Sequence, residues 1–351
     1  MKAAVLTAPR RLETVDDWPE PECGPHDVLV RLEGMGICGS DLAVFDGDRA
    51  VPALPWVVGH EGFGRVVAVG ERVVDRAAGQ RVVIEPNYAC LDCPECARGL
   101  TSACTKRAIV GMNAPGLLAE RIAVPAPFAH PVPDTADPAD LACAEPYTVA
   151  RTAVRRGGVG AGDKTLVVGA GAQGLLLCQA LLAIGIRPAV VEPRPSRLAH
   201  AEALGARAAA DGEGGFRYVF ESSGVAAGLG AALERTVPGA TAVLVGLGSA
   251  GLPLSVNQLV RSQLTLRGSL IYDHPGDFTA ALADITSGAV RPGAAICDRF
   301  SLERAQEAFA GARERAGKTW ISLDDGGCFD AGGSSDDAGR LDDGGCSDDG
   351  D

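Results

Sequence analysis

Four cysteines lie within fifteen residues of one another, at C-x2-C-x2-C-x7-C spacing. Structural zinc sites are usually formed by four thiolate or imidazole ligands, and closely spaced cysteines supply thiolates while ordering little chain. The alternatives are two disulfides in a secreted protein or scattered free thiols. The spacing favours a closed structural zinc site, which would organise a lobe and perform no chemistry, at Cys90, Cys93, Cys96 and Cys104.

A second group of metal-binding residue types lies in short glycine-containing motifs. Cys38 stands in G-I-C-G-S-D, His60 and Glu61 stand in G-H-E-G, and Glu145 precedes a proline. A catalytic zinc usually keeps three protein ligands and an open position for water or substrate. Cys38, His60 and Glu145 would supply sulfur, nitrogen and oxygen donors, and Glu61 would be a further carboxylate able to bind when the water leaves. Each residue alone has a structural explanation, as a buried thiol, a loop histidine or a helix-start carboxylate.

A glycine-rich motif of the form G-x-G-x-x-G follows these residues. The apolar run 165–168 before it reads as a buried strand, and the run 175–184 after it reads as an apolar helix. Its glycines permit a tight turn and the close approach of a dinucleotide pyrophosphate to the helix N-terminus. We therefore predict a dinucleotide site at Gly169, Gly171, Gln173 and Gly174.

The choice between NAD and NADP depends on the residues that follow the next apolar run, 188–191. Glu192 stands about 20 residues after the motif, where a carboxylate accepts hydrogen bonds from the ribose hydroxyls and repels a 2′-phosphate. Arg194 and Arg197 follow closely, and a guanidinium can pair with a phosphate. Both arginines can equally be solvated at the start of the next helix. We expect NAD to be favoured over NADP, with Glu192 and Arg197 in the cofactor site.

Over about residues 1–323 the chain resembles the zinc-containing medium-chain dehydrogenases/reductases, the alcohol dehydrogenase superfamily. Residues 36–41 are similar to the family segment G-[IV]-C-G-[ST]-D, residues 59–62 to its G-H-E-x segment, and the four cysteines to its structural zinc loop. Glu145-Pro146 at the third ligand position, in place of a cysteine, resembles the polyol, sorbitol and glucose dehydrogenase branch.

The resemblance implies an α/β protein in which a β-rich, GroES-like catalytic domain is joined to a Rossmann domain with a doubly wound parallel sheet. The sequence pattern agrees, because short apolar runs between Gly and Pro turns give way near residue 150 to alternating strand and helix patterns. We expect a discontinuous catalytic domain over 1–150 and 291–323, and a cofactor domain over 151–290. The resemblance also implies two zinc ions per chain, a homo-oligomer (dimer or tetramer) and an active site between the domains.

The implied activity is hydride transfer between a secondary alcohol of a polyol, sugar or (amino)cyclitol and a nicotinamide, giving the ketone. Zinc lowers the pKa of a bound oxygen, and the nicotinamide accepts the hydride. Ser40 would pass on the alcohol proton, although it could instead cap a helix. Lys318 could approach the zinc lobe, but it is taken as a surface lysine and left outside the site. The alternatives are a zinc dehydrogenase of simple alcohols, amino alcohols such as threonine, or aldoses, and a non-enzymatic relative. The expected catalytic residues are Cys38, Ser40, His60, Glu61 and Glu145.

Composition limits the partners and the compartment. The 351 residues carry a net charge of -13, of which the ten aspartates and one arginine of residues 324–351 leave about -4 for the rest. We expect this tail to be disordered, and the alternative is a metal-buffering or docking tail. The charge argues against nucleic-acid partners. Eleven cysteines without a secretory signal indicate a cytoplasmic protein, and the lack of an apolar run of membrane-spanning length argues against a membrane partner. The resemblance implies a small-molecule alcohol or ketone as the substrate.

Overall fold

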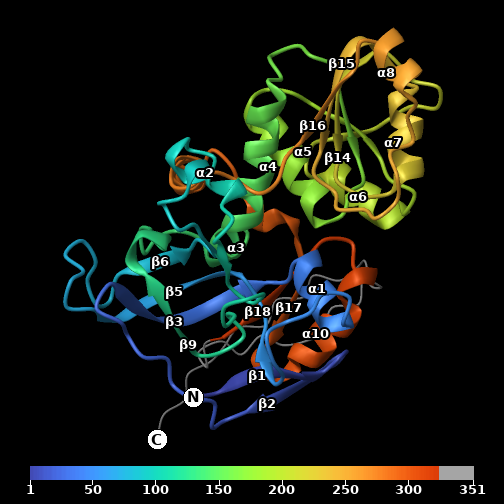
Figure 1. Cartoon of the computed structure of the whole chain (residues 1–351). Coiled ribbons are helices and arrows are strands. Elements are labelled where there is room, and N and C mark those ends of the chain that lie inside the picture. The colour runs from blue at the N-terminus through green and yellow to red at the C-terminus, as the bar shows by residue number, and fades with distance from the viewer. Residues whose placement is uncertain (324–351) are drawn as a thin grey trace, which may run out of the picture.

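The computed structural model describes residues 1–323, and the predicted acidic tail lies outside the described residues. Figure 1 shows two parts, a lower one made mainly of strands and an upper one in which helices flank a sheet. The predicted α/β fold class, with a β-rich part and a doubly wound parallel sheet, is confirmed. Among the described residues, no helix combines the length and apolarity needed to cross a bilayer.

The lower part is built on a seven-stranded sheet, in which the path β10-β6-β5-β3-β18-β17 is joined by β9 beside β3, together with a three-stranded sheet and a two-stranded ribbon. Its strands are β1 (Ala3–Ala8), β2 (Arg11–Val15), β3 (Asp27–Gly36), β4 (Trp56–Val57), β5 (Glu61–Val69), β6 (Arg81–Ile84), β7 (Asn87–Tyr88), β8 (Ala108–Ile109), β9 (Arg121–Pro125), β10 (Ala129–Pro131), β17 (Ile296–Ser301) and β18 (Lys318–Ser322). Its helices are α1 (Gly39–Asp46), α2 (Pro94–Ala97), α3 (Pro138–Ala142) and α10 (Ala305–Gly311).

The C-terminal strands of the described chain return to the N-terminal sheet. Strand β18 pairs antiparallel with β3, so that Trp320 lies opposite Gly36 and Ser322 opposite Gly34. Gly34 is needed there, because a Cβ at this position would lie 2.3 Å from the indole nitrogen of Trp320. The lower part is therefore assembled from both ends of the described chain, while the expected divisions at residues 150 and 290 stay predictions.

The upper part is a six-stranded sheet in the order β13-β12-β11-β14-β15-β16, and every pairing in it is parallel. Its strands are β11 (Thr165–Val168), β12 (Ala189–Val191), β13 (Arg207–Ala208), β14 (Phe216–Glu221), β15 (Thr236–Leu244) and β16 (Thr265–Gly268). Helices cover both faces, as Figure 1 shows: α4 (Ala144–Gly157), α5 (Ala172–Ala183), α6 (Pro195–Ala203), α7 (Ala226–Leu233), α8 (Val256–Arg261) and α9 (Gly276–Thr286). Strand β11 is buried along its whole length, as the continuous apolar run predicts.

One hydrophobic core runs through the junction of the two parts. Phe63 and Trp320 of the lower part belong to the same buried cluster as Leu175 and Phe278 of the upper part. Helix α4 carries Tyr147 into this cluster and begins at the junction. Residues in the first turn of α4 are therefore held in place against the strands that carry the predicted metal ligands.

Candidate active site and metal sites

Strand pairing brings three of the predicted catalytic ligands together. Cys38 stands at the N-cap of α1, just after β3, and Glu61 is the first residue of β5. Because Gly36 lies opposite Glu61 in the antiparallel pair of β3 and β5, the end of one strand meets the start of the other. The sulfur of Cys38, a ring nitrogen of His60 and a carboxylate oxygen of Glu61 all lie within 4.8 Å of one another.

Asp41 fixes two of these ligands. Its Oδ2 accepts the backbone N–H of Cys38 at 3.0 Å, and its Oδ1 lies 2.7 Å from Nδ1 of His60. The second contact leaves Nε2 of His60 as the ring nitrogen for a metal, which is the usual arrangement around ligating histidines. Burial alone would lower the pKa of His60, but the neighbouring Asp41 carboxylate outweighs it and raises that pKa well above its usual value.

Glu61 is fully buried, and neither of its carboxylate oxygens has a hydrogen-bond partner among the described residues. Its charge is met by Lys318, whose Nζ forms an ion pair with Oε2 and donates to the carbonyl of Ile37 at 3.1 Å. Burial would lower the pKa of Lys318, but Glu61 raises it above the ordinary lysine value. The expectation that Lys318 is a surface residue is wrong, because its exposed fraction is 2%.

Glu145 lies in the first turn of α4 and is also buried. Burial raises the pKa of its carboxyl to about 7, with Glu61 raising it further and His60 opposing the shift. The charges of Glu61 and His60 act on the carboxyl of Glu145, so Glu145 lies near these two predicted ligands. It is not a member of the close group of donors, which contains Cys38, His60 and Glu61. A mixed set of sulfur, nitrogen and buried carboxylate donors with unpartnered oxygens fits a zinc ion.

Ser40, the predicted proton acceptor, is half-buried in the first turn of α1. The helix begins at Gly39 with Cys38 as its N-cap, so Ser40 is not the capping residue. Its hydroxyl makes no hydrogen bond within residues 1–323, which leaves it available to a ligand. Its role in proton transfer stays a prediction.

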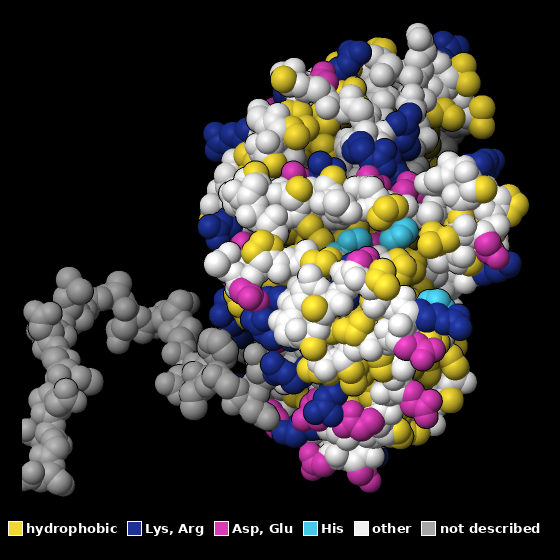
Figure 2. Space-filling view, turned by 90° about the vertical axis from the view of Figure 1, so that its left-hand side faces the viewer, with side chains coloured by type: hydrophobic (Ala, Val, Ile, Leu, Met, Phe, Trp, Pro, Cys, Tyr) yellow, Lys and Arg dark blue, Asp and Glu magenta, His cyan; other side chains and the backbone are white. Residues whose placement is uncertain are grey.

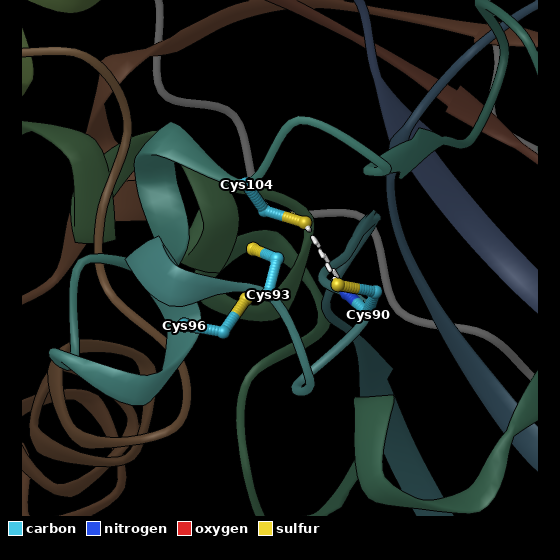
Figure 3. A group of neighbouring side chains, drawn as sticks. All are labelled: Cys90, Cys93, Cys96 and Cys104. Atoms are coloured by element: carbon cyan, nitrogen blue, oxygen red, sulfur yellow. Dashed lines mark hydrogen bonds between the residues drawn. The ribbon is translucent and has the colours of Figure 1, made fainter.

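The four closely spaced cysteines form one cluster (Figure 3), with donor atoms within 4.8 Å of one another. All four are free thiols, so the structure does not pair them as disulfides. The sulfurs of Cys90 and Cys104 lie 3.5 Å apart, close to the separation of about 3.8 Å expected for two sulfurs bound to one tetrahedral zinc. Burial raises the pKa of Cys104, but backbone N–H groups of Cys90 and Lys106 and neighbouring thiols lower it to about 7 overall. This favours a thiolate, the form that binds metal, at Cys104. A hydrogen bond with Asp92 raises the pKa of Cys90 to about 12, and burial raises that of Cys96.

The glycine motif forms the turn between β11 and α5. Gly169 has a φ of +90°, and a Cβ at Gly174 would lie 2.0 Å from the carbonyl oxygen of Gly169, so only glycine fits at Gly174. At Gly171, the N-cap of α5, a Cβ would come no closer than 3.9 Å to other atoms of the chain. Gln173 donates to the carbonyl of Pro146 at 3.3 Å, which ties the motif to α4.

Glu192 follows β12 and is held by two backbone amides. Its Oε2 accepts from Ala170 at 2.8 Å and its Oε1 from Arg194 at 3.0 Å. Arg197, in α6, donates to the carbonyls of Arg313 and Arg315. These hydrogen bonds connect the upper part to the loop that precedes β18. A cavity of about 350 Å³ opens between these elements, lined by residues that include Gly39, Ala172, Arg197, Arg313 and Thr319.

One residue that sequence reasoning missed lies beside Glu145. Tyr272 is buried in the loop between β16 and α9, and its hydroxyl accepts the side-chain amide of Asn87 at 2.9 Å. Burial raises the pKa of Tyr272 well above its usual value, with the charges of Glu145 and Glu85 adding to the shift. No motif marks this tyrosine in the sequence, because its position depends on how a loop of the upper part folds over the lower one.

Comparisons with known proteins agree with this geometry. The model of the alcohol dehydrogenase GroES-like domain matches residues 24–134, and the model of the zinc-binding dehydrogenase matches residues 172–287. Sorbitol dehydrogenase of Bombyx mori is 29% identical over 324 residues, covering 86% of this chain and 92% of the relative. Among solved structures, alcohol dehydrogenase TADH from Thermus sp. ATN1 is 30% identical with a TM-score of 0.85, covering 92% of this chain and 99% of that one. An alcohol dehydrogenase from Escherichia coli CFT073 in complex with NADH is 25% identical with a TM-score of 0.84, at the same coverage.

Proposed function

Since the chain belongs to the zinc-containing alcohol dehydrogenase family, and is thus a zinc- and nicotinamide-dependent oxidoreductase, we propose that it interconverts a secondary alcohol of a polyol, sugar or (amino)cyclitol with the ketone. The observation that carries this proposal is the buried carboxyl of Glu145 beside His60, at the position where a cysteine would stand in simple alcohol dehydrogenases. The similarity to a sorbitol dehydrogenase supports the same substrate class.

The residues that would hold the catalytic zinc are Cys38, His60 and Glu145, with Glu61 as an exchangeable fourth carboxylate. When bound, the zinc polarises the substrate oxygen and lowers the pKa of the alcohol. Asp41 keeps Nε2 of His60 turned toward the metal by holding Nδ1. Ser40 would accept the proton of the alcohol at its hydroxyl oxygen and give up its own proton, which would leave toward solvent by way of the ribose hydroxyls of a bound cofactor.

A second zinc per chain would be held by Cys90, Cys93, Cys96 and Cys104. Four thiolates complete the coordination of the ion, so this site stabilises its lobe and takes no part in turnover. The lobe lies against the loop that contains Tyr272: His274 donates its backbone N–H to Thr101 at 2.7 Å, and Ser102 donates its own to Asp273 at 3.0 Å. Order in the lobe therefore supports the position of Tyr272 near Glu145.

The dinucleotide would lie on the motif formed by Gly169, Gly171, Gln173 and Gly174, and we propose that NAD is preferred over NADP. The carboxylate of Glu192 is fixed by two amides at the end of β12, where ribose hydroxyls reach it and a 2′-phosphate is repelled. Arg197 lines the cavity of about 350 Å³ together with Ala172, the first residue of α5, and would contact the cofactor phosphates.

The proposal is tested by assaying the zinc-loaded full-length protein against sorbitol, xylitol, aminocyclitols, ethanol, threonine and glucose, each with NAD and with NADP. We expect the highest kcat/KM for a polyol or cyclitol with NAD. Glu192→Ala should shift the preference toward NADP. A higher kcat/KM for ethanol, threonine or glucose than for every polyol and cyclitol would overturn the substrate class, and a tenfold preference of the wild type for NADP would overturn the role of Glu192.

His60→Ala tests the zinc assignment separately. We expect this variant to lose one zinc ion and nearly all turnover, while it keeps dinucleotide affinity, because the cofactor binds the upper part of the molecule. Substantial turnover by a metal-free His60→Ala protein would contradict the proposed role of zinc.

We also propose a homo-oligomer, a dimer or tetramer, in the cytoplasm. Helix α8 buries no side chain in the single chain, and its Val256 and Val260 are 77% and 67% exposed. Apolar side chains of this kind are expected to be covered by another subunit. Light scattering at micromolar concentration tests the assembly, and a monomer would contradict it. The free thiols of all nine cysteines in residues 1–323 are consistent with a reducing compartment.

A further inference from the structure

A third group of metal-binding side chains lies away from both proposed zinc sites. Glu85 directly follows β6, His130 lies in β10, and His274 lies in the loop between β16 and α9. Oε2 of Glu85 is 2.6 Å from Nε2 of His130 and 2.8 Å from Nδ1 of His274. The group therefore joins the lower sheet to a loop that leads out of the upper sheet. Histidine side chains are visible at this junction of the two parts in Figure 2.

The charge of Glu85 is poorly compensated for its position. The residue is fully buried, and its Oε1 has no hydrogen-bond partner among the described residues. Its only ion-pair partners in the described part of the chain are the two imidazoles, whereas the buried Glu33 is met by Arg81 at 2.7 Å and Arg65 at 2.9 Å. A buried carboxylate normally has hydrogen bonds to both of its oxygens, and here both imidazoles contact Oε2 while Oε1 has no partner among the described residues.

Aromatic rings hold both imidazoles in place. The ring of His274 packs on Phe128 with centroids 4.5 Å apart, and the ring of His130 packs on Phe278 at 4.7 Å. Both histidine side chains are about nine-tenths buried. The nitrogens that face Glu85 are thus oriented by packing on two different sides, and His274 is oriented by a residue of the lower part.

We propose that Glu85, His130 and His274 bind a divalent transition-metal ion, with Zn²⁺ the best match to this ligand set, as a third site that fastens the two parts of the molecule together. Two imidazoles and one carboxylate are an established zinc ligand set, and they leave a further position for water. The metal would place a positive charge beside the buried carboxylate of Glu85 and give its donor atoms a common partner.

Binding requires only small movements. Bonds of 2.0–2.1 Å to a tetrahedral zinc separate its donors by about 3.3 Å, so the two nitrogens must each move away from Glu85 by about 0.5–0.7 Å. Each imidazole then carries its proton on the ring nitrogen that faces away from the metal, and the hydrogen bonds to Glu85 are replaced by metal bonds. The site performs no step of the hydride transfer, since Glu85 is not among the residues placed at the substrate or the cofactor.

The experiment counts metal in the full-length protein. Wild type and His274→Gln are loaded with zinc, freed of loosely bound ions by gel filtration, and analysed by elemental mass spectrometry. We expect the wild type to hold one zinc equivalent more than His274→Gln. Equal zinc contents in the two proteins would overturn the proposal and would leave a hydrogen-bonded group without metal.

The matched control is His200→Gln, because the two ring nitrogens of His200 contact only the carbonyls of Ala316 and Ala294. It should keep the wild-type zinc content. Circular dichroism checks that each variant is folded, and Glu85→Gln, which keeps the shape of the side chain, gives a second loss of one equivalent if His274→Gln misfolds. Retention of all the zinc by Glu85→Gln would also overturn the proposal. The test compares the zinc contents of two proteins that have the same catalytic site. If that site failed to bind zinc, both contents would fall alike and the difference between them would not change.

Discussion

Lys318 and Glu61 form an ion pair inside the protein, with exposed fractions of 2% and 0%. The same ammonium group donates to the carbonyl of Ile37, the residue before Cys38. One lysine therefore contacts both segments that carry the close group of predicted ligands. It sets the position of a carboxylate that has no other partner among the described residues.

The first prediction is that Lys318→Met destabilises the protein by about 3 kcal/mol, because removing one member of a buried pair leaves an uncompensated charge. The raised pKa of Lys318 means that the pair stabilises the fold below the unfolded-state pKa and is lost only as the pH rises through the folded-state value. The wild type therefore keeps the pair at pH 6 and at pH 9 alike. Urea unfolding measures the destabilisation. Lys164→Met, which removes the half-exposed partner of Glu213, is the control and should cost less than about 1 kcal/mol.

The second prediction concerns Asp41. Asp41→Asn should lower the affinity of the catalytic site for zinc by about 10–100-fold, because the partner that orients a ligating histidine is weakened. Competition with a chelator measures the affinity. Asp46→Asn lies in the same helix but pairs with the surface residues Arg10 and Arg313, so it should keep the wild-type affinity. Equal affinities for all three proteins would show that Asp41 does not position His60.

A third prediction separates structural from catalytic metal. Cys93→Ser should lose one zinc ion and lower the melting temperature by on the order of 5–10 °C, since binding energy at a closed site is folding energy. The control is Cys297→Ser, because Cys297 is exposed and lies outside the cluster. Full zinc content and an unchanged melting temperature in Cys93→Ser would mean that the four cysteines do not form the site.

The glycine motif supports a fourth prediction with two opposite outcomes. Gly174→Ala should unfold more easily even without cofactor, because its Cβ would lie 2.0 Å from the carbonyl oxygen of Gly169. Gly171→Ala should keep the stability of the free protein, since nothing lies within 3.9 Å, yet bind the dinucleotide less tightly. Thermal unfolding and cofactor titration distinguish the two effects. Unchanged cofactor affinity in Gly171→Ala would place the pyrophosphate elsewhere.

The fifth prediction concerns how the stability contributed by Asp140 depends on pH. The carboxyl of Asp140 accepts the backbone N–H of Gly293 at 2.8 Å, where α3 meets the chain that leads into β17. Burial raises the pKa of this carboxyl. A raised pKa means that its ionised form opposes folding, so stability is present below the unfolded-state pKa and falls as the pH rises through the folded-state value. Asp140→Asn should therefore melt no lower than the wild type at pH 7, and any advantage should shrink toward pH 4. A clear loss at pH 7 would show that the weak contact with Arg291 outweighs burial.

The parts of the molecule that depend on local patterns could be predicted from the sequence. The run 165–168 forms β11 with those bounds, because a β-branched threonine and three apolar residues, all buried, lie between a lysine and a glycine. Cys38, His60 and Glu61 could be predicted as neighbours because Cys38 lies in one short motif and His60 and Glu61 lie together in another, and the structure brings the three close to one another.

The contacts made across long stretches of chain could not be predicted in this way. Lys318 reads as an ordinary lysine until β18 is placed beside β3. Glu85, His130 and His274 stand in three separate segments, and only the packing of a loop on the lower sheet brings them together. Periodicity carries information about which face of an element is buried, but not about which distant side chain it meets.

The pairing of β18 with β3 has a consequence for how the chain is made. During synthesis the upper sheet is complete once residue 268 has left the ribosome, so it can form early, as domains commonly do. The lower sheet lacks its β17 and β18 strands, and Glu61 its lysine, until residues 296–322 emerge. A nascent chain can thus complete the strands of its upper sheet before it completes those of the lower sheet, which carries Cys38, His60 and Glu61.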